Sequence, residues 1–200
     1  MKALSLESAD RNIRVQFPED IPMGREAFFD FCQTNKELRI ERDAEGNIIV
    51  MSPTEMETGG RNASLTAQLY NWAKGGGRGI TFDSNTGFEL PNGATRSPDA
   101  SWLTQEKWDA IPSEERSRFA RVCPDFVIEL RSQTDRLTVL LAKMEEYISN
   151  GAKLGFLIDP LEAKVHVYRP GAEAEILDNP KTISAEPEMP GLVFVLADVW

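Results

Sequence analysis

The chain has 200 residues, is 41% hydrophobic and carries a formal net charge of -10. This length suits one domain with one sizeable core, so we expect a single domain over residues 1–200. The chain has one histidine and two cysteines, too few for a disulfide framework or for a metal site built from several imidazoles or thiolates. The acidic net charge counts against a nucleic-acid binder, because such proteins usually present a basic surface.

The first quarter of the chain predicts a helix followed by a β-hairpin. Apolar residues recur at helical spacing over residues 21–36, at Phe28, Phe31 and Cys32. Leu38 and Ile40 then alternate with charged residues, residues 43–47 supply a turn, and residues 48–51 are β-branched and apolar. Both cysteines, Cys32 and Cys123, are expected to be reduced core residues.

The middle of the chain predicts a second helix and several strands. Beyond Pro53, apolar residues share one helical face up to the glycines at 75–77, which lack the Gly-Lys-Ser/Thr ending of a phosphate-binding loop and therefore indicate helix termination. Strands are expected near 80–90 and 97–103, a charged helical excursion over 104–121, and a strand over 125–131.

The last third contains the strongest helical pattern of the sequence. Residues 136–150 carry a stripe of apolar side chains, namely Leu137, Leu140, Leu141, Met144 and Ile148. A second hairpin is predicted over 154–168, with His166 on its surface, and a final strand over 191–199 after an irregular segment at 179–190. No apolar run approaches the roughly 18 residues of a membrane span, so we expect a cytoplasmic protein with no membrane partner.

Two acidic residues on neighbouring predicted strands suggest a metal site. Alternation along 97–103 places Asp99 opposite the apolar face, and the same alternation along 125–131 does so for Glu129. If the strands are neighbours, about 4.8 Å apart, both carboxylates can reach one Mg²⁺ or Mn²⁺ ion. Asp125 lies four residues from Glu129, roughly 13 Å along a strand, and is therefore the weaker candidate.

Such a site suits phosphodiester hydrolysis. A carboxylate-bound metal activates a water molecule and offsets transition-state charge, and a nearby lysine can orient or deprotonate the water or neutralise the phosphate. The alternative is that Asp99 and Glu129 are strand-surface carboxylates that form ordinary ion pairs with Arg131 and Lys143.

Several stretches of the chain match a known pattern. They are Ile48-Ile49-Val50-Met51-Ser52-Pro53, Ser97-Pro98-Asp99, Pro124-Asp125-Phe126-Val127-Ile128-Glu129-Leu130, Asp159-Pro160 and Val165-His166-Val167-Tyr168-Arg169-Pro170-Gly171. Together with Lys143 and Tyr147, they resemble the Uma-two-type endonuclease family, common in cyanobacteria, of the PD-(D/E)XK restriction-endonuclease-like superfamily. The resemblance covers roughly residues 28–171.

The resemblance implies an α/β (α+β) fold with a mixed β-sheet core, flanking helices and additional β-hairpins. By the same likeness, Asp99 and Glu129 are the acidic motif residues and Lys143 is the lysine displaced onto the following helix. Arg131 occupies the superfamily's usual lysine position, where arginine is a poor base but can bind phosphate. Glu57 matches a helix-borne glutamate, although Thr54 and Glu57 also form a capping-box pattern.

The function that this resemblance implies is a Mg²⁺- or Mn²⁺-dependent endonuclease acting on nucleic acid, with DNA as the expected substrate. A homodimer would suit double-strand cleavage. The alternative is a catalytically inactive nuclease-like fold that serves as a binding module or oligomeric scaffold. The acidic charge and the arginine at position 131 favour that alternative.

Overall fold

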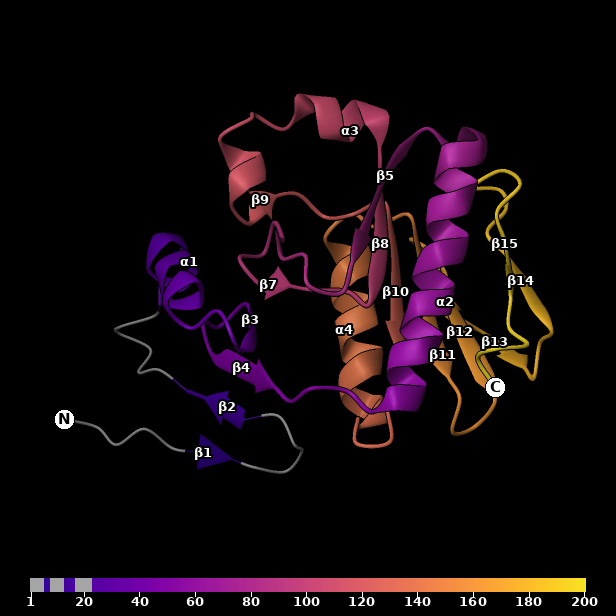
Figure 1. Ribbon diagram of the computed structural model, residues 1–200, viewed down its shortest axis with the longest axis horizontal. Coiled ribbons are helices and arrows are strands. Elements are labelled where there is room, and N and C mark those ends of the chain that lie inside the picture. Colours follow the sequence, from indigo (N-terminus) through magenta and orange to yellow (C-terminus); the bar gives the residue numbers. More distant parts are fainter. Residues whose placement is uncertain (1–5, 8–12, 17–22) are drawn as a thin grey trace.

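The computed structural model describes residues 6–7, 13–16 and 23–200, and a mixed β-sheet forms its centre (Figure 1). The order of this central sheet is β13-β12-β11-β10-β8-β5. Strands β10 and β11 run parallel, and the other neighbouring pairs are antiparallel. The strands are β5 (Gly79–Asp83), β8 (Ala100–Thr104), β10 (Phe126–Leu130), β11 (Leu154–Asp159), β12 (Lys164–Tyr168) and β13 (Glu175–Asp178).

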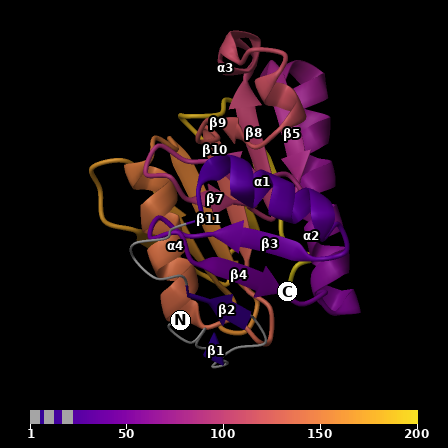
Figure 2. The same cartoon turned by 90° about the vertical axis from the view of Figure 1, so that its left-hand side faces the viewer.

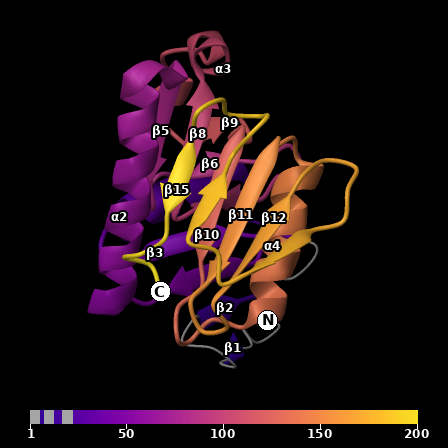
Figure 3. The same cartoon turned by 90° about the vertical axis from the view of Figure 1, so that its right-hand side faces the viewer.

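Helices cover both faces of the central sheet. On one face lie α2 (Met56–Trp72), which buries Leu65 and Leu69, and the two-stranded sheet of β14 (Thr182–Ser184) and β15 (Val193–Val195), as Figure 3 shows from that side. On the other face lies α4 (Leu137–Ser149), which buries Met144 and Tyr147. The apolar stripe predicted over 136–150 is therefore the face that α4 packs on the sheet.

The face of β10 that carries Glu129 is more enclosed than the sequence analysis predicted. Val127 packs in the same buried cluster as Met144 and Leu157, and every residue of β10 is buried. The predicted polar face is therefore a second core face, because α4 covers it. Glu129 is a polar exception within that face, and its burial shapes its chemistry.

A second sheet lies on the same side of the central sheet as α4. It packs against α1 (Arg25–Thr34), and Figure 2 shows α1 beside β3 and β4. Its order is β1-β2-β4-β3-β7-β6-β9. Phe28 of α1 packs on Ile40 and Ile48, and Gly46 makes the β3–β4 turn with a φ of 88°, which glycine adopts readily. The strands are β1 (Leu6–Glu7), β2 (Ile13–Val15), β3 (Arg39–Arg42), β4 (Ile48–Met51), β6 (Phe88–Glu89), β7 (Thr95–Arg96) and β9 (Ala120–Arg121).

The helical excursion predicted over 104–121 is shorter than expected. It contains α3 (Gln105–Ala110) and a 3-10 turn, η2 (Glu115–Ser117). Pro112 accounts for the break, because proline disfavours helical backbone in the residue before it, and Ile111 is extended. The helix predicted to end at the glycines 75–77 does so, since α2 continues as a π-helical turn, η1 (Ala73–Gly77).

Two further predictions are corrected. The segment 179–190 is not wholly irregular, because it contains β14. This strand pairs with β15, which lies near the end of the chain. His166 is buried, with only 7% of it exposed, and not on the surface as predicted. It lies on β12, which has β11 and β13 as neighbours in the central sheet and contacts α4.

Cys32 and Cys123 are free, as predicted. Within the described residues, none of the helices combines the length and apolar character that crossing a membrane requires.

Candidate active site

Asp99, directly before β8, and Glu129, on the neighbouring strand β10, line one cavity. The antiparallel register pairs Ala100 with Ile128, so one step further along places Asp99 across from Glu129. Both side chains line a cavity of about 490 Å³ between the central sheet, the second sheet and the start of α4. The neighbouring strands on which the predicted site depended are therefore present.

Asp99 is held in place by three groups. Its Oδ2 accepts a hydrogen bond of 2.9 Å from the backbone N–H of Leu130, on the neighbouring strand. Its Oδ1 accepts a 3.3 Å bond from the side-chain amide of Asn62 on α2, and Arg39 lies 3.5 Å from the same oxygen. The carboxylate therefore has a fixed orientation at the wall of the cavity.

Glu129 is buried against α4. Its Oε1 lies 2.8 Å from Nζ of Lys143 and accepts a 2.9 Å hydrogen bond from the hydroxyl of Tyr147. Burial is the largest influence on the pKa of Glu129 and Lys143 opposes it, but the charges of Asp99 and Glu41 act with burial, and the pKa is raised overall to about 7. This environment disfavours an additional negative charge and favours a further cation.

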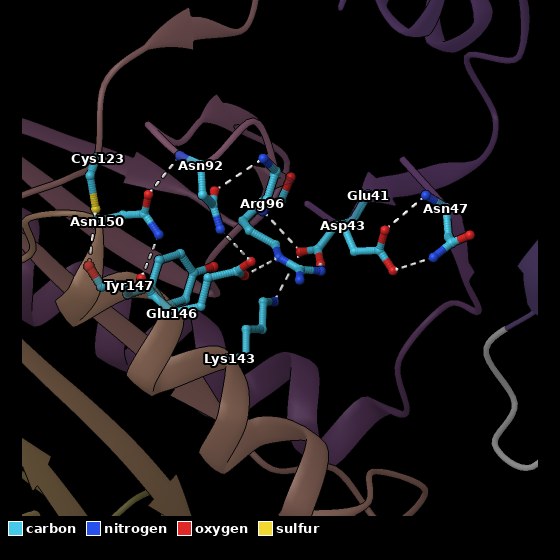
Figure 4. A network of polar contacts seen from close by, with 12 residues as sticks. Glu41, Asp43, Asn47, Asn92, Arg96, Cys123, Lys143, Glu146, Tyr147 and Asn150 are labelled. Atoms are coloured by element: carbon cyan, nitrogen blue, oxygen red, sulfur yellow. Dashed lines mark hydrogen bonds and ion pairs between the residues drawn. The ribbon is translucent and has the colours of Figure 1, made fainter. Parts of the chain in front are cut away.

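Lys143 lies between two carboxylates, as Figure 4 shows for its side facing Glu41. Its Nζ is 2.8 Å from Glu129 and 2.9 Å from Oε1 of Glu41. Burial lowers the pKa of Lys143, but these two carboxylates outweigh burial, and the pKa is raised overall. Of the roles considered for this lysine, the arrangement favours a fixed ammonium over a base.

Glu41 is a site residue that the sequence analysis missed. It is 3% exposed and accepts hydrogen bonds from the backbone of Ser97 at 2.9 Å and from Arg96 at 3.2 Å. Burial raises the pKa of Glu41, but Lys143 and Arg96 lower it more, to about 2. The sequence did contain a signal for Glu41, because the alternation of side chains along β3 places Arg39 and Glu41 on one face of the strand.

The cavity lining contains charges of both signs, with a surplus of acidic side chains. The basic residues are Arg14, Arg39, Arg96, Arg136 and Lys143. The acidic residues are Glu41, Asp43, Glu55, Asp99, Glu129, Asp135 and Glu146. Basic groups that a phosphate requires are thus present despite the net charge of -10, and the acidic surplus favours a cation beside them.

The other predicted candidates lie away from Asp99 and Glu129. Arg131 pairs with the buried Asp159 at 2.7 Å. Asp125 accepts a 3.0 Å bond from the backbone of Thr104 and pairs with Lys107 at 3.0 Å, near the start of β10. These contacts give both residues a role in holding strands and loops together.

Glu57 also lies apart from the cavity. Its side chain is 80% exposed and pairs with Arg61, one helical turn away, at 3.7 Å. The capping-box prediction is wrong, because Glu55 is the N-cap of α2 and the cap has no side-chain hydrogen bond. The residues of α2 that line the cavity are instead Thr58 and Asn62.

The donor groups of the site suit hydrated Mg²⁺. The described residues contain no group of three or more His, Cys, Asp or Glu side chains placed to hold a metal. Mg²⁺, however, is commonly bound through one or two carboxylates while it keeps several water molecules. The oxygen donors of Asp99 and Glu129, on one cavity wall, therefore fit this ion, and Mn²⁺ accepts the same donors.

The comparison with protein families agrees with this geometry. The Uma2 family, described as "Putative restriction endonuclease", matches residues 25–197. The chain belongs to the Uma2 family. No curated protein matches this Uma2 chain significantly.

A solved structure shows the same fold. It is described as a "putative nuclease belonging to DUF820" from Anabaena variabilis ATCC 29413, with a TM-score of 0.67 and 24% sequence identity. The match covers 80% of this Uma2 chain and 88% of the other. The mixed sheet flanked by helices is thus a nuclease-like fold.

Proposed function

We propose that this Uma2 chain is a Mg²⁺- or Mn²⁺-dependent endonuclease that hydrolyses phosphodiester bonds in nucleic acid, with DNA as its substrate. One observation carries the proposal. Asp99, directly before β8, and Glu129, on the adjacent strand β10, line one cavity, with Nζ of Lys143 2.8 Å from Glu129. Membership of a family described as "Putative restriction endonuclease" supports it.

Each residue has a role that follows from its position. Bound between Asp99 and Glu129, a divalent ion would supply a water molecule of lowered pKa and positive charge beside the phosphate. Lys143 places a fixed ammonium beside Glu129. Arg39, 30% exposed and 3.5 Å from Asp99, is placed to hydrogen-bond a phosphate oxygen that enters the cavity.

Two further residues position this set. Glu41 is the second carboxylate that contacts the ammonium of Lys143, beside Glu129. Tyr147 donates to the same Glu129 oxygen that Lys143 contacts. Preorganised charges of this kind lower the barrier because they need not rearrange during the reaction.

Cleavage of supercoiled plasmid DNA with added Mg²⁺ or Mn²⁺ tests the proposal. We expect Asp99→Asn and Glu129→Gln to lose cleavage while they keep a folded circular-dichroism spectrum. Glu145→Gln is the matched control, because Glu145 is exposed on α4 and loses the same charge. Undiminished cleavage by both site variants, or equal cleavage in excess EDTA, would refute the proposal.

A second candidate is a catalytically inactive nuclease-like fold that acts as a binding or oligomeric scaffold module. The acidic surplus of the cavity lining and the pairing of Arg131 with Asp159 favour it. Binding of DNA or RNA without cleavage at any divalent ion concentration is the result expected of this alternative. Sedimentation of the same samples tests the homodimer that would suit double-strand cleavage.

A further inference from the structure

A polar groove continues from Asp99 along α2 and β5. It has a volume of about 760 Å³ and shares Asn62 and Asp99 with the cavity described above. Figure 1 shows α2 beside β5, which is the edge strand of the central sheet. The two openings therefore meet at one of the proposed metal ligands.

The groove and the cavity differ in charge. Arginine and lysine side chains line the cavity, whereas those described residues that line the groove include no basic side chain. Hydroxyl and amide groups predominate instead, on Asn62, Thr66, Asn71, Thr81, Ser84 and Thr86. Phosphates are bound mainly by basic groups, while neutral donors and acceptors suit the edges of nucleobases.

Two polar atoms in the walls of the groove lack a partner. Oδ1 of Asn62 and Oγ1 of Thr81 are buried and have no hydrogen-bond partner among the described residues. The amide nitrogen of the same Asn62 donates to Asp99. A buried polar atom without a partner costs free energy, so a small rotation toward a polar ligand in the groove would be favourable.

An exposed aromatic ring, that of Tyr70, is among the groups that line the groove. Tyr70 is 51% exposed, and Nζ of Lys74 lies 5.4 Å from the centre of its ring. Asn62, Thr66 and Tyr70 follow one another at intervals of four residues, so they share one face of α2. This face leads from Asn62, which bonds Asp99, to Tyr70 over about 12 Å of helix axis.

We infer that the groove binds an unpaired nucleotide next to the scissile phosphate, with its base stacked on Tyr70 and its polar edge hydrogen-bonded by Thr81. The inference rests on the proposed function, and it names the substrate class of that site as nucleic acid with a single-stranded segment at the cleavage point. Stacking on a protein ring requires a base released from its own helix. Fully paired DNA presents no such base.

Binding of fluorescein-labelled oligonucleotides in EDTA tests this inference without cleavage. The probes are a single strand and a blunt duplex of the same sequence, followed by fluorescence anisotropy. We expect Tyr70→Ala to weaken single-strand binding by about tenfold, since a stacked base is worth roughly 1–3 kcal/mol. Tyr70→Phe keeps the ring and should bind like the parent, while Thr81→Val should also weaken binding.

Ile176→Ala is the matched control, because Ile176 is exposed on β13, at the opposite edge of the central sheet. Equal single-strand binding by the parent, Tyr70→Ala and Thr81→Val would overturn the inference, as would tighter binding of the duplex. Plasmid cleavage separates the two proposals. Mg²⁺-dependent cleavage with no effect of Tyr70→Ala on binding overturns the groove alone, and Tyr70-dependent binding without cleavage overturns the hydrolysis alone.

Discussion

Lys143 contacts two buried carboxylates, Glu129 and Glu41. Of these two, Glu41 is the simpler one to test by experiment. Glu41 is buried and bonds to Lys143 and Arg96, which keeps its pKa at about 2. A carboxyl whose folded pKa lies below its unfolded value stabilises the protein above the unfolded pKa. That stabilisation is lost as the pH falls from about 4.5 toward 2.

Glu41→Gln should therefore destabilise the protein at pH 7 by about 3 kcal/mol, which corresponds to the shift from 4.5 to about 2. Urea unfolding at a series of pH values measures the effect. The difference between parent and variant should shrink steadily below pH 4.5, because the parent then protonates Glu41 on unfolding. A difference that stays constant down to pH 2.5 would contradict the assignment.

Lys143 itself is expected to act through its charge. Lys143→Met should reduce DNA cleavage by roughly 10²-fold, as removal of one preorganised charge does in other sites. Lys143→Arg keeps the charge and should retain part of the activity. Lys181→Met removes an exposed lysine and serves as the control. Initial rates of plasmid nicking measure all three, and equal losses for Lys143→Met and Lys181→Met would refute the role.

At the scale of elements, β5 depends on a close approach that only glycine permits. A Cβ on Gly79 would collide with the backbone carbonyl of Leu103 and the ring of Trp102, both on β8. Gly60, in the interior of α2, has no atom within 4 Å of the same position. Alanine at these two positions should therefore change the stability in opposite directions, and both glycines lie in elements that form the groove.

Gly79→Ala should destabilise the protein by roughly 1–3 kcal/mol, because β5 must shift away from β8. Gly60→Ala should stabilise it by about 0.5–1 kcal/mol, because alanine loses less backbone freedom in a helix. Thermal unfolding measured by circular dichroism compares the two variants with the parent. A rise in Tm for Gly79→Ala would show that β5 does not pair closely with β8.

At the scale of the whole molecule, a bound cation should stabilise the folded state. Asp99 and Glu129 lie about 30 residues apart in the chain and meet only after folding, so the proposed Mg²⁺ site would exist in the folded state and not in the unfolded chain. Mg²⁺ at 100 times its Kd should add about 2.7 kcal/mol to the free energy of unfolding. Calorimetric Tm values with and without Mg²⁺ measure this increment.

Asp99→Asn should abolish the Mg²⁺-dependent rise in Tm, although its amide oxygen can still accept the hydrogen bond from Leu130. Asp198→Asn, at an exposed position near the end of the chain, should keep the full rise. A rise of equal size in both variants would mean that Mg²⁺ binds elsewhere on this acidic protein.

Local patterns in the sequence were enough to predict α4 and the strands β8 and β10. Each follows from a repeat of 3.6 or 2 residues, which is written along the chain itself. Only the tertiary structure decided that α4 buries Glu129, that Glu41 meets Lys143 across 102 positions of sequence, and that Arg131 turns to Asp159. Contacts between residues so far apart leave no periodic signal, and the burial that sets the charge of a carboxyl depends on every element packed around it.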